Sequence, residues 1–231
     1  MGYDNVLRIA QCEVQMKQGN LDLAMELSTN LIKHGVGGTK LLHLRSKIYY
    51  LQGNFPAAIK HLRQLLSGDP DNTACAKDIK KIRKLEKKKL EGNEFFKSAQ
   101  WEAAYTSYTE CMEFDTENKL FCAKLLSNRA AVLNKLRRFP EAVADCDQAI
   151  EYDPTYTKAY MRRAQNNLLI NEIENIELAI RDYEQAKRLM GDVADTKDID
   201  KSIREAQVAL KQAKRKDYYK ILGCTVSALK M

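Results

Sequence analysis

Apolar and polar positions repeat along this chain with the spacing expected for paired amphipathic helices. Shifting the sequence against itself by 34 residues places segment 17–21 (KQGNL) over segment 51–55 (LQGNF), and Ala24 over Ala58. The glycine in the middle of each segment suits a sharp reversal between two helices, because glycine adopts positive φ without steric cost. The two alanines supply small side chains where paired helices approach closely, and apolar residues follow them at helical spacing. The pattern predicts a helix–turn–helix unit that recurs along the chain.

Further copies of this unit follow with drifted spacing. Trp101 and Ala104 realign with Phe139 and Ala142 after 38 residues, and Ala179 belongs to the matching pattern of a last copy. A spacing that stretches by a few residues is compatible with stacked helix pairs, because each unit packs only against its neighbours. We therefore predict five repeats, which start near residues 5, 39, 85, 123 and 157.

The predicted fold class is all-α, a right-handed superhelical solenoid of antiparallel helix pairs with the tetratricopeptide period. Segment 73–84 contains no proline or glycine and keeps apolar residues at helical spacing, so we expect a helix that links two repeat blocks. The expected organisation is two N-terminal repeats (1–72), a linking helix (73–84), a three-repeat domain (85–192), a capping helix (193–216) and a short final segment (217–231).

Charge and composition restrict the partners and the compartment. The formal net charge of +7 and the pI near 9.0 are compatible with a nucleic acid, an anionic membrane or an acidic peptide. The six cysteines form no CxxC pair and share no ligand spacing with the three histidines, so we expect buried thiols and no metal or other cofactor. No apolar run is long enough to span a membrane. We expect a protein of the reducing cytosol or nucleus with no membrane partner.

Candidate binding residues lie on the first helices of the last three repeats. Lys89 and Asn93 are four residues apart, as are Lys158 and Arg162, and Asn128 lies at the corresponding level of the fourth repeat. First helices line the concave groove of such solenoids, so these five side chains should point into one channel. Cations and amides that converge without a nearby acid predict an anion site, because they donate charge-assisted hydrogen bonds to a carboxylate.

These residues resemble a known set. The last three repeats are similar to the carboxylate-clamp tetratricopeptide domains, which bind the Glu-Glu-Val-Asp ends of the 70- and 90-kDa heat-shock chaperones. The resemblance implies that Asn93 and Asn128 hold the terminal main-chain carboxylate. It also implies that Lys158 and Arg162 take acidic groups of the tail and that Lys89 completes the clamp. The expected function is that of a co-chaperone adaptor.

A second resemblance concerns the end of the chain. Segment 214–223 (KRKDYYKILG) resembles the opening of a J domain, which implies a tetratricopeptide co-chaperone with a C-terminal J domain. The His-Pro-Asp triplet that works in J domains does not occur in this sequence. We therefore expect the J domain to be truncated here, the chain to be a fragment or a short isoform, and no stimulation of an ATPase by that route.

Other readings compete with the adaptor. A general scaffold would bind internal cargo peptides whether or not they carry a free C-terminus. The basic segment 77–89 raises nucleic-acid binding, although its interleaved apolar residues favour a solvated helix face. No nucleophile elbow, catalytic histidine cluster or glycine-rich loop favours an enzyme.

The first two repeats lack the candidate residues. At the levels of Lys89, Asn93 and Asn128 they carry Ile9, Glu13 and Leu44. We expect an apolar groove with an acid there, and a role that differs from carboxylate binding.

Overall fold

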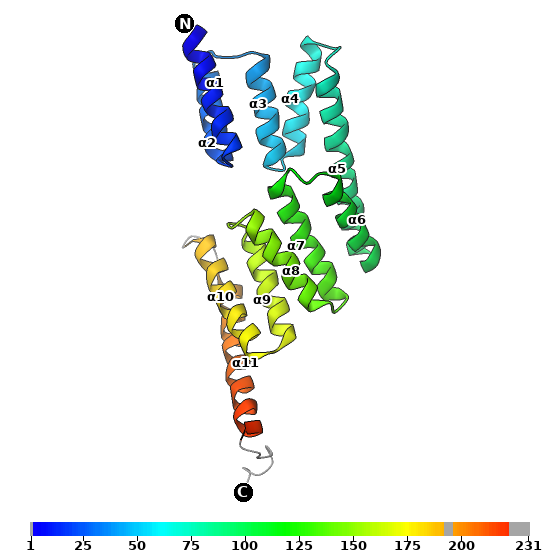
Figure 1. Cartoon of the computed structure of the whole chain (residues 1–231), viewed down its shortest axis with the longest axis vertical. Coiled ribbons are helices and arrows are strands. Elements are labelled where there is room, and N and C mark those ends of the chain that lie inside the picture. The colour runs from blue at the N-terminus through cyan, green and yellow to red at the C-terminus, as the bar shows by residue number, and fades with distance from the viewer. Residues whose placement is uncertain (1, 192–195, 222–231) are drawn as a thin grey trace. The chain divides into compact units, whose positions relative to one another are not determined.

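The structure is a computed structural model that describes residues 2–191 and 196–221, with side chains for residues 5–191 and 196–216. The described residues form helices and connecting turns (Figure 1). The helices are α1 (Gly2–Lys17), α2 (Leu21–Lys33), α3 (Thr39–Leu51), α4 (Phe55–Gly68), α5 (Thr73–Lys97), α6 (Trp101–Phe114), α7 (Lys119–Lys135), α8 (Phe139–Tyr152), α9 (Thr157–Ile170), α10 (Ile173–Met190) and α11 (Lys197–Ile221). The predicted all-α fold of stacked helix pairs is confirmed.

The chain divides into two compact units, which we describe separately. The first comprises residues 1–93 and 110–121, and the second comprises residues 94–109 and 122–231. In the first unit α1 packs on α2 and α3 packs on α4; in the second, α8, α9, α10 and α11 pack in sequence. The boundary falls inside α5, α6 and α7, so these three helices contribute residues to both units.

The turn inside each helix pair carries one residue with positive φ. Gly19 and Gly53 have φ of 85° and 76°, as the sequence pattern predicts. The same turn in the later pairs is occupied by Ala99, Arg137 and Asn171, with φ of 59°, 60° and 64°. Left-handed backbone is strained for residues with a Cβ, and asparagine tolerates it best among them. Two of the five turns therefore contain a residue poorly suited to their backbone.

Replacing the exposed Arg137 by glycine is expected to raise the free energy of unfolding by about 0.5–1 kcal/mol, because glycine relieves the left-handed strain. Urea denaturation followed by circular dichroism measures the change. Lys135→Gly is the matched control, because Lys135 is also exposed but is the last residue of α7. Glycine disfavours helical backbone, so this substitution should lower the free energy of unfolding by about 0.5–1 kcal/mol. Equal destabilisation by both substitutions would show that the turn is not strained.

The small residues of the repeat are buried at the helix contacts. Ala24, Ala58, Ala104, Ala142 and Ala179 are each 0% exposed, which confirms their predicted role. Larger apolar side chains pack around them, as Leu31, Leu41 and Ile48 do in the first unit. The described cysteines at positions 12, 75, 111, 122 and 146 are buried and form no disulfide with one another. Burial raises the pKa of the Cys146 thiol to about 12.

Two helices, α5 and α11, run across limits of the expected segments. Residues 73–84 and the following first helix of the third repeat form one continuous helix, α5, with Gly92 buried inside it. The capping segment forms α11, in which Ile199 and Ile203 pack against Ala179 and Tyr183 of α10. This helix continues to residue 221, so it includes the first residues of the J-like segment, while residues 192–195 and 222–231 lie outside the described residues. The division into domains stays a prediction.

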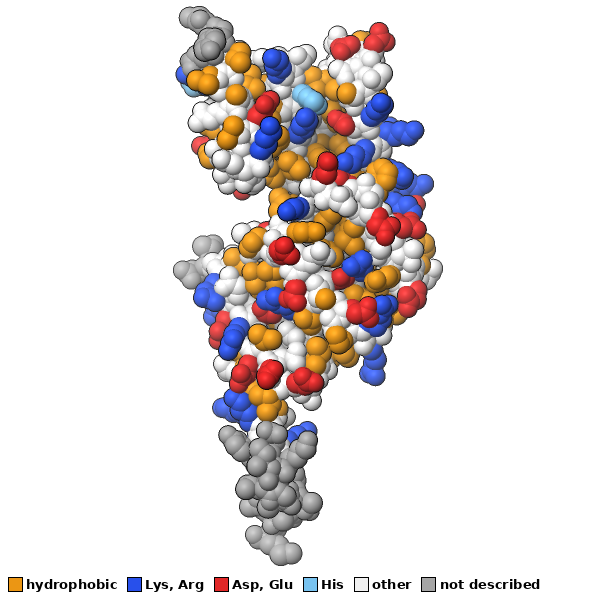
Figure 2. All heavy atoms as spheres, viewed as in Figure 1, with side chains coloured by type: hydrophobic (Ala, Val, Ile, Leu, Met, Phe, Trp, Pro, Cys, Tyr) orange, Lys and Arg blue, Asp and Glu red, His pale blue; other side chains and the backbone are white. Residues whose placement is uncertain are grey.

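The charge of α5 is concentrated on its outer surface. In Figure 2 cationic side chains gather over α5, at the upper right of the view. The exposed cations of this helix include Lys77, Lys80, Arg83 and Lys87. The apolar residues of α5 are buried, as expected for a helix with one solvated face. No described helix has the length and hydropathy that a membrane span requires.

Candidate peptide-binding site

Two of the predicted site residues lie on α5 in the first unit. Lys89 and Asn93 are half-buried and one helical turn apart, so they share a face of the helix. The Lys89 ammonium lies 6.0 Å from the centroid of the Phe121 ring. Among the described residues of this unit, no carboxylate forms an ion pair with Lys89, whereas Lys81 and Lys88 on the same helix pair with Asp115 and Glu110.

The other three residues lie in the second unit, on α7 and α9. The Arg162 guanidinium donates to the Ser127 hydroxyl at 2.7 Å and to the Asn128 amide oxygen at 3.2 Å. Lys158 is exposed one turn earlier on α9. The structure therefore brings Asn128 and Arg162 into direct contact, and the contact leaves the amide N–H groups of Asn128 as donors.

The five residues thus form two groups. Lys89 and Asn93 belong to the first unit, and Asn128, Lys158 and Arg162 belong to the second. Each group has the helical spacing that the sequence indicates. The convergence of all five on one ligand stays a prediction.

The arginines of α7 and α9 differ in how their charge is balanced. Arg129 makes two hydrogen bonds to Asp145, at 2.8 and 2.7 Å, and Arg163 makes two to Asp182, at 2.8 and 2.6 Å. Bonding to these carboxylates raises the pKa of both guanidinium groups. The Arg162 guanidinium instead donates to two neutral oxygens, those of Ser127 and Asn128, and no described residue of its unit forms an ion pair with it. Its charge is therefore available to an external anion.

Neighbouring side chains respond to the charge of Arg162. Burial raises the pKa of Tyr156 and of Tyr108, and the positive charge of Arg162 opposes that rise in both. Burial raises the pKa of Cys146 as well, again against the charge of Arg162. The half-buried guanidinium thus acts on a region with little water, where a bound carboxylate would interact more strongly than in bulk solvent.

Sequence reasoning missed the residues that support this group. Ser127, which fixes the Arg162 guanidinium, directly precedes Asn128 and was not singled out. Asp145 and Asp182 each follow the repeat alanine by three residues, at positions 142 and 179. This shared spacing is a sequence signal that could have pointed to the two aspartates, although it does not identify the arginines that they neutralise.

The structure corrects one expectation for the first unit. Leu44, expected to line an apolar groove at the level of Asn128, is only 3% exposed and belongs to the core, against which Ile9 also packs. The reason is that α3 turns this position toward α1 and α2. Glu13 is exposed.

Comparison with known proteins agrees with the helix pairs and turns described above. A family model for the tetratricopeptide repeat matches residues 123–156. The chain resembles the solved tetratricopeptide domain of P58(IPK), with a TM-score of 0.70 and 22% identity over 90% of this chain and 56% of that one, a likeness that concerns the fold alone. The chain has the fold of a tetratricopeptide-repeat solenoid, with a tetratricopeptide repeat at residues 123–156.

The sequence is also similar to a group of curated relatives. It is 38% identical to a DnaJ homolog subfamily C member 7 homolog of Dictyostelium discoideum, over 98% of this chain and 41% of that protein. It is 33% identical to human DnaJ homolog subfamily C member 7, over 96% of this chain and 43% of the human protein. The chain is therefore homologous to DnaJ homolog subfamily C member 7, as the sequence resemblance indicated. It spans less than half the length of these curated relatives.

Proposed function

We propose that this protein is a co-chaperone adaptor that binds the acidic C-terminal tails of the 70- and 90-kDa heat-shock chaperones, in the cytosol or nucleus. Asn128 and Arg162 hold the tail in the second unit, with Lys158 beside them, and Lys89 and Asn93 complete the clamp. The observation that carries the proposal is the state of Arg162, a half-buried cation held by Ser127 and Asn128 and paired with no described acid of its unit.

Electrostatics explains why a tail with a free end is preferred. A chain that ends in aspartate presents a main-chain carboxylate and a side-chain carboxylate within a few ångströms of each other. Lysine, asparagine and arginine can donate to both, and each charge-assisted hydrogen bond contributes about 1.5–3 kcal/mol. The homology to DnaJ homolog subfamily C member 7 supports a role beside chaperones.

Binding of a peptide that ends in Glu-Glu-Val-Asp is expected to weaken by about ten- to a hundredfold when its C-terminus is amidated. The amide removes one negative charge and leaves the side chains unchanged. Isothermal titration calorimetry with the two peptides and the full chain measures the difference. Equal affinities would contradict the clamp and favour a scaffold for internal cargo peptides.

A further inference from the structure

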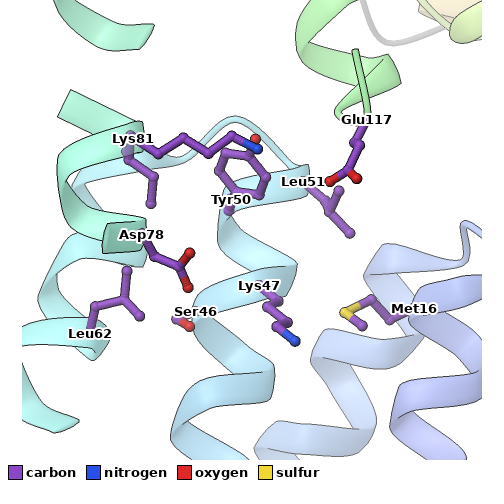
Figure 3. A pocket seen from close by; sticks show the side chains of 10 residues that line it. Met16, Ser46, Lys47, Tyr50, Leu51, Leu62, Asp78, Lys81 and Glu117 are labelled. Carbon is purple, nitrogen blue, oxygen red and sulfur yellow. The ribbon is translucent and has the colours of Figure 1, made fainter. Parts of the chain in front are cut away.

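A cavity of about 300 Å³ lies in the first unit, between α1, α3, α5 and the segment before α7. Its apolar wall is formed by Met16, Leu51, Leu62 and Ile82. Figure 3 shows that several charged side chains reach the same space from different helices. Cavities of this size with an apolar wall and a few polar groups are typical of sites for small ligands or single side chains.

One charged pair at the edge of the cavity is already balanced. Lys81 donates to the Asp115 carboxylate at 3.1 Å, and the Tyr50 hydroxyl donates to the other oxygen of the same carboxylate. Asp115 is only 3% exposed, so this pair fixes the segment before α7 against α3 and α5. Neither Lys81 nor Asp115 contributes net charge to the cavity.

The remaining charges leave the cavity acidic. The Asp78 carboxylate has His43 Nε2 at 4.0 Å, but burial, followed by the charge of Lys47, lowers the pKa of His43, so the imidazole is neutral near pH 7. Glu117 is exposed and forms no ion pair with a described residue of this unit. Asp78 and Glu117 therefore face a single unpaired cation in the cavity lining, Lys47.

We propose that this cavity binds the arginine side chain of an internal peptide segment. The apolar stem of an arginine would pack on Met16 and Leu51, and the planar guanidinium would donate to a carboxylate of the lining, that of Asp78 or that of Glu117. The site is separate from the five clamp residues and has the opposite charge preference. It gives the surface between the first two repeats, the start of α5 and the segment before α7 a peptide-binding role of its own.

Citrulline has the shape of arginine without its charge, so it provides the direct test. A short peptide with one arginine beside a leucine, acetylated and amidated so that it carries no free terminus, is expected to bind the full chain about tenfold or more tightly than its citrulline twin. Fluorescence polarisation with labelled peptides measures both affinities. Equal affinities of the two peptides would overturn the proposal, and this comparison requires no variant of the protein.

A pair of variants locates the binding. Asp78→Asn with Glu117→Gln should remove the arginine preference, whereas Glu26→Gln with Asp71→Asn makes the same charge change at exposed acids outside the cavity lining and should keep it. An equal loss in both double variants would place the effect in net charge and contradict the proposed site. Acid-ended peptides should bind the Asp78 and Glu117 variant normally, so the clamp and this cavity can succeed or fail separately.

Discussion

Replacing Asp182 by alanine is expected to lower the free energy of unfolding by about 3–5 kcal/mol. Asp182 is 5% exposed and accepts two hydrogen bonds from Arg163, so its removal leaves a half-buried guanidinium whose one remaining ionic partner among the described residues is the exposed Asp147. Urea denaturation followed by circular dichroism measures the loss, and the transition of the second unit should shift to lower urea.

The net contribution of the Arg163–Asp182 pair to the free energy of unfolding is smaller than the loss expected when one partner is removed. The pKa of Asp182 is raised, with burial as the largest cause and the charge of Asp147 adding to it, despite the opposing hydrogen bonds and charge of Arg163. The double variant Arg163→Met with Asp182→Leu should therefore recover most of the stability that Asp182→Ala loses. Asp147→Ala is the matched single control, because its side chain is 55% exposed and its pair should contribute about 0–1 kcal/mol. A loss below about 1 kcal/mol for Asp182→Ala contradicts this account.

The sequence allowed the repeat to be predicted because close helix contacts restrict side-chain size. Ala58 and Ala142 are 0% exposed at such contacts, where small residues are favoured, so they recur and can be aligned. The turn at Arg137 could not be predicted in this way. Arginine has no preference for left-handed backbone, so its presence in the sequence does not indicate a turn. The continuity of α5 was not predicted, because the period of the repeat places the start of a new unit near residue 85, inside the helix.

The candidate site was predictable to a different extent. Residues four apart on one helix share a face, so the grouping of Lys158 with Arg162 follows from spacing alone. The charge balance of the arginines does not follow from spacing on one helix. The carboxylate partners of Arg129 and Arg163 come from other helices, 16 and 19 residues away in the chain. Only the fold distinguishes a neutralised arginine from one that is available to a ligand.

Arg162→Ala is expected to weaken the binding of a Glu-Glu-Val-Asp peptide by about ten- to a hundredfold. The substitution removes the guanidinium that contacts Asn128, so the ligand loses a charge-assisted hydrogen bond and the amide loses the group that orients it. Calorimetry with the free-acid peptide measures the change. Lys158→Ala should have a smaller effect with a steeper dependence on salt, because Lys158 is exposed and its charge is screened.

The control for Arg162→Ala is Arg188→Ala, which removes the same charge from an exposed position in the last turn of α10 and should leave the affinity unchanged. Thermal melting of both variants separates loss of binding from loss of structure. If Arg162→Ala binds like the parent protein, or if Arg188→Ala loses as much affinity, the attraction comes from the overall positive charge. In that case the contact between Arg162, Ser127 and Asn128 serves only to pack α9 against α7, because a binding role requires the loss to follow this one guanidinium.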